Sequence, residues 1–392
     1  MRRNTNLLLL MTAILFLTGC DGIMDSQADA GSSDSDPVQI TGTPISGQYI
    51  VVLNEPSNGT VRGKTTAKLA VESILSENDI NLGSLQNTYS AVMTGFSAKL
   101  SDSELEKLKG DNRVKYIEQD RVFTLGKPSW AGGGGSNTSG QVTPYGITRV
   151  GGSGTSSNTA WVIDTGVDLD HPDLNVDLNR SVSFISNGPD SKDGNDMNGH
   201  GTHVAGTIAA IDNDRDVIGV AAGATVVAVK VLDRRGSGSY SGVIAGVDYV
   251  ANNASSGDVA NMSLGGPASQ ALDDAILAAS SVVKFALAAG NDASNANNYS
   301  PARVNGPNIY TISAMDENDE FAYFSNFGNP PVDFCAPGVA IESLWKDGGT
   351  NTISGTSMAT PHVAGLLLLG AISTDGNVIG DLDSNPDPIA HR

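Results

Sequence analysis

The sequence predicts an α/β protein built on a doubly wound, mainly parallel sheet and preceded by a small α+β domain. From Gln141 onward, short apolar runs alternate with segments of helical periodicity. These runs are near-continuous stretches of Val, Ile and Ala, which is the composition of parallel strands covered on both faces. In residues 47–125 the elements follow the order β, α, β, β, α, β, which suits a ferredoxin-like fold.

The larger domain, 141–372, alternates strands and helices throughout. Its expected strands cover 159–163, 225–231, 259–263, 282–288 and 309–314, and its expected helices cover 203–210, 241–252 and 270–280. In a doubly wound sheet ligands bind outside the carboxyl ends of the strands, so the functional residues are expected there.

The smaller domain, 47–125, shows both strand and helix periodicity. Tyr49, Val51 and Leu53 alternate as a strand. A helix is expected to begin at Ser101, where Glu104 completes a capping box. An earlier helix has one apolar face, formed by Ala67, Ala70, Val71, Ile74 and Leu75.

Residues 1–20 have the features of an export signal. Two arginines precede an apolar run, residues 7–17, that is too short to serve as a comfortable membrane span. The run ends in Leu17-Thr18-Gly19-Cys20, which resembles a bacterial lipoprotein signal in which Cys20 carries the lipid. An ordinary secretory signal is the alternative. No later stretch is apolar enough to span a bilayer.

Composition limits the partners and the cross-links. The 392 residues carry a formal net charge of −20, which argues against nucleic acid and anionic membrane surfaces as partners. A membrane is expected only through a lipid on the precursor. The chain has two cysteines. If Cys20 is lipidated, Cys335 has no partner, so we expect an exported domain without disulfides in which Cys335 is a small buried apolar residue.

Three segments are expected to lie outside the two domains. Residues 21–46 are mostly small and polar and indicate a disordered tether. Residues 126–140 contain a run of four glycines, 132–135, and indicate a cleavable linker. Residues 373–392 indicate a polar tail, which holds several aspartates but lacks the later Glu of an EF-hand calcium loop.

The stretch Gly355 to Gly365 has the character of a nucleophile mounted on a helix. Gly355 permits a tight turn, Ser357 falls at the helix start, and Pro361 is expected in the first turn, where proline is tolerated. A serine in this position has an exposed hydroxyl beside outward-pointing N–H groups that could hold an oxyanion. The alternative is a serine that merely caps a buried helix.

Further residues could complete a catalytic group. Asp164 ends a strand before a glycine turn, and Asn291 follows the strand 285–289, where its amide could donate to an oxyanion. Each of the two could also be an ordinary turn residue. His200 opens a helix between two glycines and is the better candidate for a base. His203 lies one turn further in and is expected to be structural, because a metal pair with His200 would lack a third ligand nearby.

These segments together closely resemble the subtilisin-like (subtilase) serine proteases. The matching motifs are Asp164-Thr165-Gly166, Gly199-His200-Gly201-Thr202-His203, Ser263-Leu264-Gly265-Gly266, Ala288-Ala289-Gly290-Asn291 and Gly355-Thr356-Ser357-Met358-Ala359. Their order Asp, His, Ser is that of subtilisin, whereas Ser comes first in the α/β-hydrolases. Residues 47–125 resemble the inhibitor propeptide of the same family. Residues 298–301 look like the proteinase K branch, whereas 141–146 look like the mature start of subtilisins.

The resemblance implies a role for each matched residue. Ser357 would be the nucleophile, His200 the general base and then acid, and Asp164 the group that orients and stabilises the imidazole. Asn291 and the Ser357 backbone N–H would hold the oxyanion. The substrate-binding segments would comprise Ser263, Leu264, Gly265, Gly266, Ala288, Ala289 and Gly290. Because this lining is small and apolar and has no carboxylate at its base, it implies broad endopeptidase activity with apolar or aromatic P1 residues.

The same resemblance implies a structural Ca²⁺ site. Gln141, Asp173 and Asn213 match the family's ligands near the mature N-terminus, after the first catalytic strand and in the loop after the His helix. Such oxygen-rich groups suit a hard cation. Arg215 and Asp216 depart from the usual apolar and glycine residues. A carbonyl ligand at 215 survives this change, while the loss of glycine at 216 could strain the loop. An acidic, solvated loop is the alternative.

Taken together, these features indicate an exported serine endopeptidase that is made as a self-processing zymogen and acts as a monomer. Its partners would be protein or peptide substrates and its own propeptide, an intramolecular inhibitor. Cleavage within 126–140 would leave the lipid on the propeptide. The precursor would then be a membrane-anchored lipoprotein of the cell envelope, and the mature enzyme secreted or periplasmic. The rival hypothesis is a catalytically silent envelope lipoprotein that uses the fold to bind peptides.

Overall fold

The computed structural model describes residues 41–55, 63–125, 129–130 and 140–392. The expected export signal, the lipid site Cys20, most of the tether and most of the linker lie outside the described residues. Among the residues that are described, no helix is long and apolar enough to cross a bilayer.

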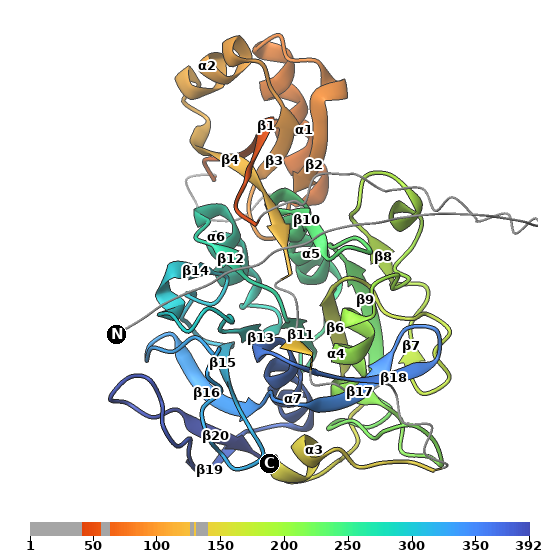
Figure 1. Ribbon diagram of the computed structural model, residues 1–392. Coiled ribbons are helices and arrows are strands. Elements are labelled where there is room, and N and C mark those ends of the chain that lie inside the picture. The colour runs from red at the N-terminus through yellow and green to blue at the C-terminus, as the bar shows by residue number, and fades with distance from the viewer. Residues whose placement is uncertain (1–40, 56–62, 126–128, 131–139) are drawn as a thin grey trace, which may run out of the picture. The chain divides into compact units, whose positions relative to one another are not determined.

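The N-terminal domain has the predicted order of elements. These are β1 (Pro44–Leu53), α1 (Lys64–Glu77), β2 (Leu85–Tyr89), β3 (Gly95–Lys99), α2 (Asp102–Gly110) and β4 (Val114–Thr124). The four strands form an antiparallel sheet in the order β4-β1-β3-β2, and the two helices pack on it through Val71, Ile74 and Leu108 (Figure 1). The predicted capping box is present at the start of α2, where the Ser101 N–H donates to the Glu104 carboxylate (2.8 Å).

Strand β1 begins at Pro44, inside the segment predicted as a tether. The Gly42 N–H donates to the Val122 carbonyl, and the Val122 N–H donates to the Thr43 carbonyl (2.8 Å each). The chain therefore already follows β4 at this point. Backbone pairing of this kind needs no apolar side chains, which is why composition did not reveal it.

The larger domain contains the predicted parallel sheet, whose central order is β16-β15-β13-β11-β6-β9 (Figure 1). The neighbouring pairs in this order are all parallel. The strands are β6 (Thr159–Asp164), β9 (Thr225–Lys230), β11 (Val259–Met262), β13 (Lys284–Ala288), β15 (Ile309–Met315) and β16 (Val332–Pro337). The first five match predicted strands, whereas β16 had not been predicted.

Helices cover both faces of this sheet, as the doubly wound fold requires. They are α4 (His200–Ala209), α5 (Tyr240–Asn253), α6 (Gln270–Ala279) and α7 (Thr356–Leu369). Successive residues of β6 point to opposite faces: Val162 joins the core under α4 and α7, while Trp161 and Ile163 join the core under α5 and α6. In Figure 1, α5 and α6 lie on the side that carries the N-terminal domain.

Residues 373–392 are part of the fold, so the prediction of a polar tail was wrong. They form β19 (Ser373–Asn377) and β20 (Pro388–His391), and β20 extends the sheet beside β16. Val378 and Ile389 are buried against Cys335, which is itself fully buried as predicted. A few apolar residues and the sheet's backbone hydrogen bonds anchor a segment whose composition is otherwise polar.

Strand β4 is one of the segments of the N-terminal domain that contact the larger domain. The last residues of β4 pair antiparallel with β10 (Ser237–Ser239). Two acidic residues of β4 also accept hydrogen bonds from the starts of helices. Asp120 accepts from the Ser241 N–H (3.1 Å), and Glu118 accepts from the Ala271 N–H (3.0 Å). Both contacts place a negative charge at the positive end of a helix dipole.

Candidate active site

Asp164 and His200 form a buried hydrogen-bonded pair. Asp164 is the last residue of β6 and His200 is the first residue of α4. The His200 Nδ1 lies 2.8 Å from the Asp164 Oδ1, and the two side chains are only 3% and 0% exposed. Burial by itself lowers the pKa of His200, but the charge and hydrogen bond of Asp164, with the charge of Asp196, outweigh it and raise the pKa above its usual value. With Nδ1 directed at the carboxylate, Nε2 is the nitrogen left for proton transfer.

A second buried carboxylate, Asp196, ties these two residues' segments together. Its Oδ1 accepts from the Thr165 hydroxyl and the Gly199 N–H (2.9 Å each), and its Oδ2 accepts from the Thr202 N–H (2.9 Å) and hydroxyl (2.7 Å). Asp196 therefore links the end of β6 to the first turn of α4. Sequence reasoning missed this residue, because it lies three residues before the N-cap, Gly199, and not at the position where a capping aspartate is expected.

Lys230, at the end of β9, supports the same strand end. Its ammonium group is fully buried, donates to the Thr165 carbonyl (2.5 Å) and lies 3.0 Å from the Asp190 carboxylate. Removing one partner of such a pair leaves an uncompensated buried charge, at a cost of about 3–5 kcal/mol. The sequence did offer a sign of this role, because Lys230 is the single charged residue in the apolar run 225–231. The sequence analysis did not assign it a role.

Ser357 is the second residue of α7 and makes two hydrogen bonds with Ser263. Its hydroxyl donates to the Ser263 carbonyl (3.1 Å), and the Ser263 hydroxyl donates to the Ser357 carbonyl (2.8 Å). Pro361 explains the second bond, because it has no N–H to give to the carbonyl four residues earlier. The proline lies in the second turn of α7 and not in the first, so the predicted position was wrong. Among the described residues, no hydrogen bond joins Ser357 to His200 in this arrangement.

Asn291 lies next to the start of α7, and Thr356 holds its amide. The Asn291 Oδ1 accepts from the Thr356 N–H (2.8 Å) and from the Thr356 hydroxyl (3.0 Å). These two donors fix the orientation of the amide and leave its NH₂ group available as a donor. Sequence reasoning assigned no role to Thr356.

The two predicted substrate-binding segments follow neighbouring parallel strands, β11 and β13. Their side chains are mostly turned into the protein. Ser263, Leu264, Gly266, Ala288 and Ala289 are buried, and only Gly265 and Gly290 are half-buried. Gly290 has a positive φ of 110°, and a Cβ there would lie 2.3 Å from the Asn326 amide, so no other residue fits at this position.

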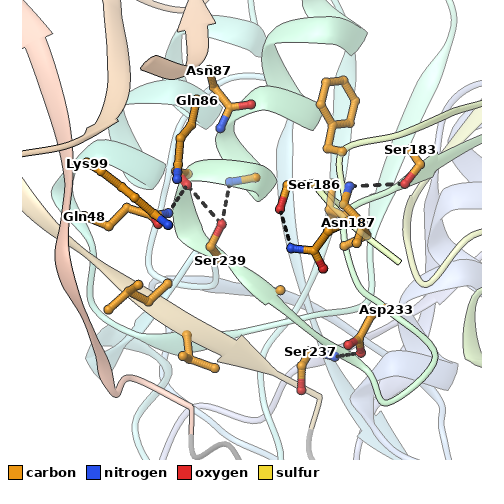
Figure 2. Close-up of a pocket in the computed structure, with 18 of the residues that line it drawn as sticks. Gln48, Gln86, Asn87, Lys99, Ser183, Ser186, Asn187, Asp233, Ser237 and Ser239 are labelled. Atoms are coloured by element: carbon orange, nitrogen blue, oxygen red, sulfur yellow. Dashed lines mark hydrogen bonds between the residues drawn. The ribbon is translucent and has the colours of Figure 1, made fainter. Parts of the chain in front are cut away.

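A polar cleft of about 840 Å³ lies between the two domains and not over Ser357. Figure 2 shows side chains from both domains around it. Its lining contains no residue of the predicted catalytic group. The labelled lining residues are Gln48, Gln86, Asn87 and Lys99 from one domain, and Ser183, Ser186, Asn187, Asp233, Ser237 and Ser239 from the other.

The three predicted calcium ligands come together in the structure. The Gln141 amide donates to the carbonyls of Ile211 (2.7 Å) and Val217 (3.2 Å), and the Asn213 amide donates to the Asp173 Oδ1 (2.6 Å). Asp173 is fully buried, and its Oδ2 has no hydrogen-bond partner among the described residues. Burial raises the pKa of Asp173 to about 6. A buried carboxylate ringed by amides and carbonyls fits a hard cation.

Two further observations concern the ligands and the loop of this proposed calcium site. The described residues contain no group of three or more His, Cys, Asp or Glu side chains placed to hold a metal, so a cation there would depend on amide and carbonyl oxygens. Asp216 adopts a left-handed φ of 49°. Asp and Asn tolerate this region better than most residues other than glycine, which is how the loop accommodates the loss of glycine.

The remaining two histidines of interest are structural, as predicted. The His203 Nε2 lies 3.0 Å from the Ile341 carbonyl, and the His362 Nδ1 lies 2.9 Å from the Met358 carbonyl. Both side chains are fully buried, and burial lowers the pKa of His203 to about 3 and that of His362 to about 4. Both rings are therefore neutral near pH 7.

Comparisons with known proteins identify the family of this chain. Residues 157–371 match the model of the subtilase family, and residues 48–126 match that of peptidase inhibitor I9. The chain is 42% identical over 338 residues to an alkaline serine exoprotease A of Vibrio alginolyticus, an alignment that covers 83% of this chain and 60% of the relative. It is 37% identical over 384 residues to an extracellular serine proteinase of Thermus sp., covering 92% of this chain and 88% of the relative.

A solved structure of a subtilisin-like proteinase is also similar to this chain. The crystal structure of a cold adapted subtilisin-like serine proteinase matches with a TM-score of 0.55 and 40% identity, covering 63% of this chain and 97% of that one. The fold, the order of the motifs and the relatives agree. The chain therefore belongs to the subtilase family of serine proteases, with a peptidase inhibitor I9 domain ahead of its protease domain.

Proposed function

We propose that this chain is a serine endopeptidase made as a self-processing zymogen, in which Asp164, His200 and Ser357 form the catalytic triad. The observation that carries this proposal is the 2.8 Å hydrogen bond between the buried side chains of Asp164 and His200. Asp164 ends β6 and Asn291 follows β13, two strands of the same parallel sheet, and Ser357 lies in the first turn of α7, which packs against this sheet. This is the edge at which doubly wound folds bind ligands.

The reaction begins when the Ser357 hydroxyl leaves the Ser263 carbonyl and turns to His200 Nε2. The Oγ attacks the scissile carbonyl carbon while His200 takes the proton, and the adjacent Asp164 stabilises the imidazolium that forms. His200 then gives this proton to the departing amine, which leaves an ester between Ser357 and the acyl half of the substrate. A water molecule, deprotonated by His200, hydrolyses the ester and regenerates the serine.

The oxyanion of each tetrahedral intermediate is stabilised by the Asn291 amide and the Ser357 backbone N–H. Thr356 supports this role because its two hydrogen bonds occupy the Asn291 Oδ1 and leave the NH₂ group to donate. A donor that is already oriented does not have to reorganise as charge develops. Loss of one such donor typically lowers kcat by about 10² to 10³.

The substrate binds as an added strand along Ser263–Gly266 and beside β10. Gly265 and Gly290 present backbone without side chains, which leaves room for a large P1 residue. None of the seven substrate-binding residues carries a charge. These features support a preference for apolar or aromatic P1 residues and broad specificity.

The described residues on both sides of 126–128 are hydrogen-bonded to the protease domain. The Leu125 N–H donates to the Gly236 carbonyl (2.8 Å) just beyond the β4–β10 pairing. Shortly afterwards β5 (Ser129–Trp130) pairs with β18 (Gly349–Ser354), which ends three residues before Ser357. On the carboxyl-terminal side of residues 126–128, Ser129 thus pairs with Ser354, three residues before the nucleophile. We infer that the first cleavage occurs between Leu125 and Ser129 and not in the glycine run 132–135.

A structural calcium ion at Gln141, Asp173 and Asn213 is part of this proposal, with the carbonyls of Ile211 and Val217 as further ligands. Such an ion would neutralise the buried Asp173 carboxylate. It would also tie the start of the protease domain, at Gln141, to the loop after α4.

Export follows from the sequence features of residues 1–20, and several relatives are named as extracellular or alkaline proteases. If Cys20 is lipidated and cleavage occurs after Leu125, the lipid stays on the inhibitor fragment. The active monomer is then released from the membrane. Mass spectrometry of the active fragment tests this, because acyl chains covalently attached to it would contradict the release.

The proposed activity is tested by incubating the purified chain with casein and with a chromogenic peptide that has an apolar P1 residue. The expected result is turnover, together with labelling by a fluorophosphonate. Ser357→Ala should lose labelling and about 10⁶ in kcat, as in other triad serine proteases. Absence of turnover and of labelling in the processed protein would instead favour the rival hypothesis of a peptide-binding lipoprotein.

A further inference from the structure

Asp216 brings a second acidic side chain to the cation site. We propose that the Asp216 carboxylate is a ligand of the divalent cation held at Gln141, Asp173 and Asn213, so that two carboxylates of this chain bind it. The inference rests on the calcium site proposed above. It adds a residue at a position where the family resemblance implies glycine, which has no side chain to offer.

The backbone fixes Asp216 beside the proposed members of the site. Its carbonyl accepts the Val142 N–H (2.8 Å), and the next residue, Val217, forms a parallel bridge with Val142. The Gln141 amide reaches the Val217 carbonyl (3.2 Å). Residues 216–217 therefore run directly alongside 141–142, at the place where the Gln141 side chain enters the site.

Two carboxylate oxygens are left unsatisfied at this place. The Asp173 Oδ2 and the Asp216 Oδ2 are both buried, and neither has a hydrogen-bond partner among the described residues. Asp173 is tied to the same loop, because its Oδ1 accepts from the amide of Asn213 (2.6 Å), three residues before Asp216. Two buried anionic oxygens without donors are costly, and a divalent cation is the partner that neutralises both.

The neighbouring cation Arg215 does not fulfil this role. Its Nε lies 3.4 Å from the Asp216 Oδ2, in a contact that does not meet hydrogen-bond geometry, and its side chain is 51% exposed. An exposed ion pair of this kind contributes little, about 0–1 kcal/mol. The same loop carries two further acids, Asp212 and Asp214, both exposed. The local charge therefore remains negative with Arg215 included.

The amides in the site can exchange donors for oxygens. The NH₂ groups of Gln141 and Asn213 now point at carbonyl and carboxylate oxygens. Rotation of each amide by half a turn presents its oxygen instead, as a cation requires. An ionised carboxylate has only acceptor oxygens, so rotation cannot present a donor. The two oxygens without hydrogen-bond partners are therefore the feature of this site that specifically indicates a cation.

The test uses the full chain with Ser357→Ala, which prevents self-cleavage, and calcium chloride as the probe. Calcium affinity is measured by isothermal titration calorimetry and the melting temperature is measured in EDTA and in calcium. The variants are Asp216→Asn, Asp216→Gly and Asp173→Asn. Asp214→Asn is the matched control, since Asp214 is an exposed acid of the same loop. Asp216→Gly keeps the backbone free to adopt the left-handed φ if the Asn variant folds poorly.

We expect Asp216→Asn and Asp216→Gly to weaken calcium binding by at least about tenfold, because the charge of the ligands tunes affinity. Asp214→Asn should stay within about twofold of the parent. In EDTA, Asp216→Asn should melt close to the parent, because the ion pair that it removes, with the exposed Arg215, contributes little. Affinities for Asp216→Asn and Asp216→Gly that equal the Asp214→Asn control would overturn the role of Asp216. In that case, weakened binding in Asp173→Asn would still support the site itself, whereas a parent that binds no calcium would refute both proposals.

Discussion

Ser263 and Ser357 are joined by two reciprocal hydrogen bonds between side chain and backbone. The Ser357 hydroxyl donates to the Ser263 carbonyl, and the Ser263 hydroxyl donates to the Ser357 carbonyl. The second bond exists because Pro361, in the second turn of α7, has no N–H for that carbonyl. A helix-breaking residue thus leaves one acceptor free on the nucleophile itself, and Ser263, the residue that follows β11, uses it to fix the start of α7.

Ser263→Ala should therefore destabilise the protein by about 1–3 kcal/mol, the cost of an unsatisfied buried acceptor. The measurement is the thermal unfolding midpoint in a Ser357→Ala background, which keeps the carbonyl and prevents self-digestion. Adding Pro361→Ala restores an N–H four residues after the carbonyl and should recover part of the loss. If the effects of Ser263→Ala and Pro361→Ala simply add, the proposed link between the two residues is wrong.

Asp196→Asn should move the acidic limb of the kcat/KM pH profile to lower pH. His200 must be neutral to act as a base, and its pKa is raised mainly because Asp164 outweighs the effect of burial, with the charge of Asp196 adding to it. Removal of the Asp196 charge lowers the pKa of His200, so a larger fraction of the imidazole is neutral at a given acidic pH.

The control for this prediction is Asp193→Asn, which alters a more exposed acid of the same loop. It should leave the limb in place. A merely structural role for Asp196 would lower activity at every pH without shifting the profile. An unshifted limb, or one shifted to higher pH, would therefore contradict an electrostatic role.

Asn291→Ala should lower kcat by about 10² to 10³ with little change in KM, because the oxyanion forms only after binding.

Thr356→Val tests whether the Thr356 hydroxyl holds the Asn291 amide in place. It removes one of the two donors to the Asn291 Oδ1 and keeps the backbone donor. A loss of roughly 2- to 12-fold in kcat is expected, equivalent to one hydrogen bond of about 0.5–1.5 kcal/mol. Thr356→Ser keeps the hydroxyl and should stay near the parent, and equal losses in both variants would argue against this contact.

The main strands, and the placing of Asp164, His200, Asn291 and Ser357 at strand and helix ends, could be predicted because they depend on local sequence, whereas the roles of these four residues rested on the family resemblance. Apolar runs mark the strands, and glycines mark the turns at which these residues stand. In a parallel sheet the ends of neighbouring strands meet at one edge, so residues far apart in sequence could be expected to meet.

Contacts that depend on the tertiary fold could not be predicted in this way. Asp196 and Lys230 act through Thr165, and only the folded chain brings these segments together. The strand β20 was missed because it is held by backbone pairing and by a few apolar residues such as Ile389. The position of Pro361 was misjudged because nothing in the local pattern reveals that the Ser263 hydroxyl replaces its missing N–H.

The I9 domain docks through a carboxylate of the protease domain, and this contact gives a last prediction. Asp248, on α5, accepts the N–H groups of Ser90 (2.8 Å), Ala91 (2.6 Å) and Val92 (3.1 Å). The side chain is 7% exposed, so these charge-assisted bonds are shielded from water. Asp248→Asn should therefore release the cleaved inhibitor domain faster and shorten the lag before protease activity appears.

The Asp248→Asn effect should be large, because a hydrogen bond to a charged group is worth about 1.5–3 kcal/mol, or roughly 10- to 160-fold in the inhibition constant. The lag is measured with a chromogenic peptide after self-cleavage of the full chain, and the inhibition constant is measured by adding back the cleaved fragment. Glu317→Gln, which changes an exposed acid of the protease domain, should leave both values at those of the parent. The kcat of the fully activated Asp248→Asn enzyme should be unchanged, since Asp248 touches no residue of the proposed triad. A lag and an inhibition constant equal to those of Glu317→Gln would show that the carboxylate does not hold the inhibitor domain.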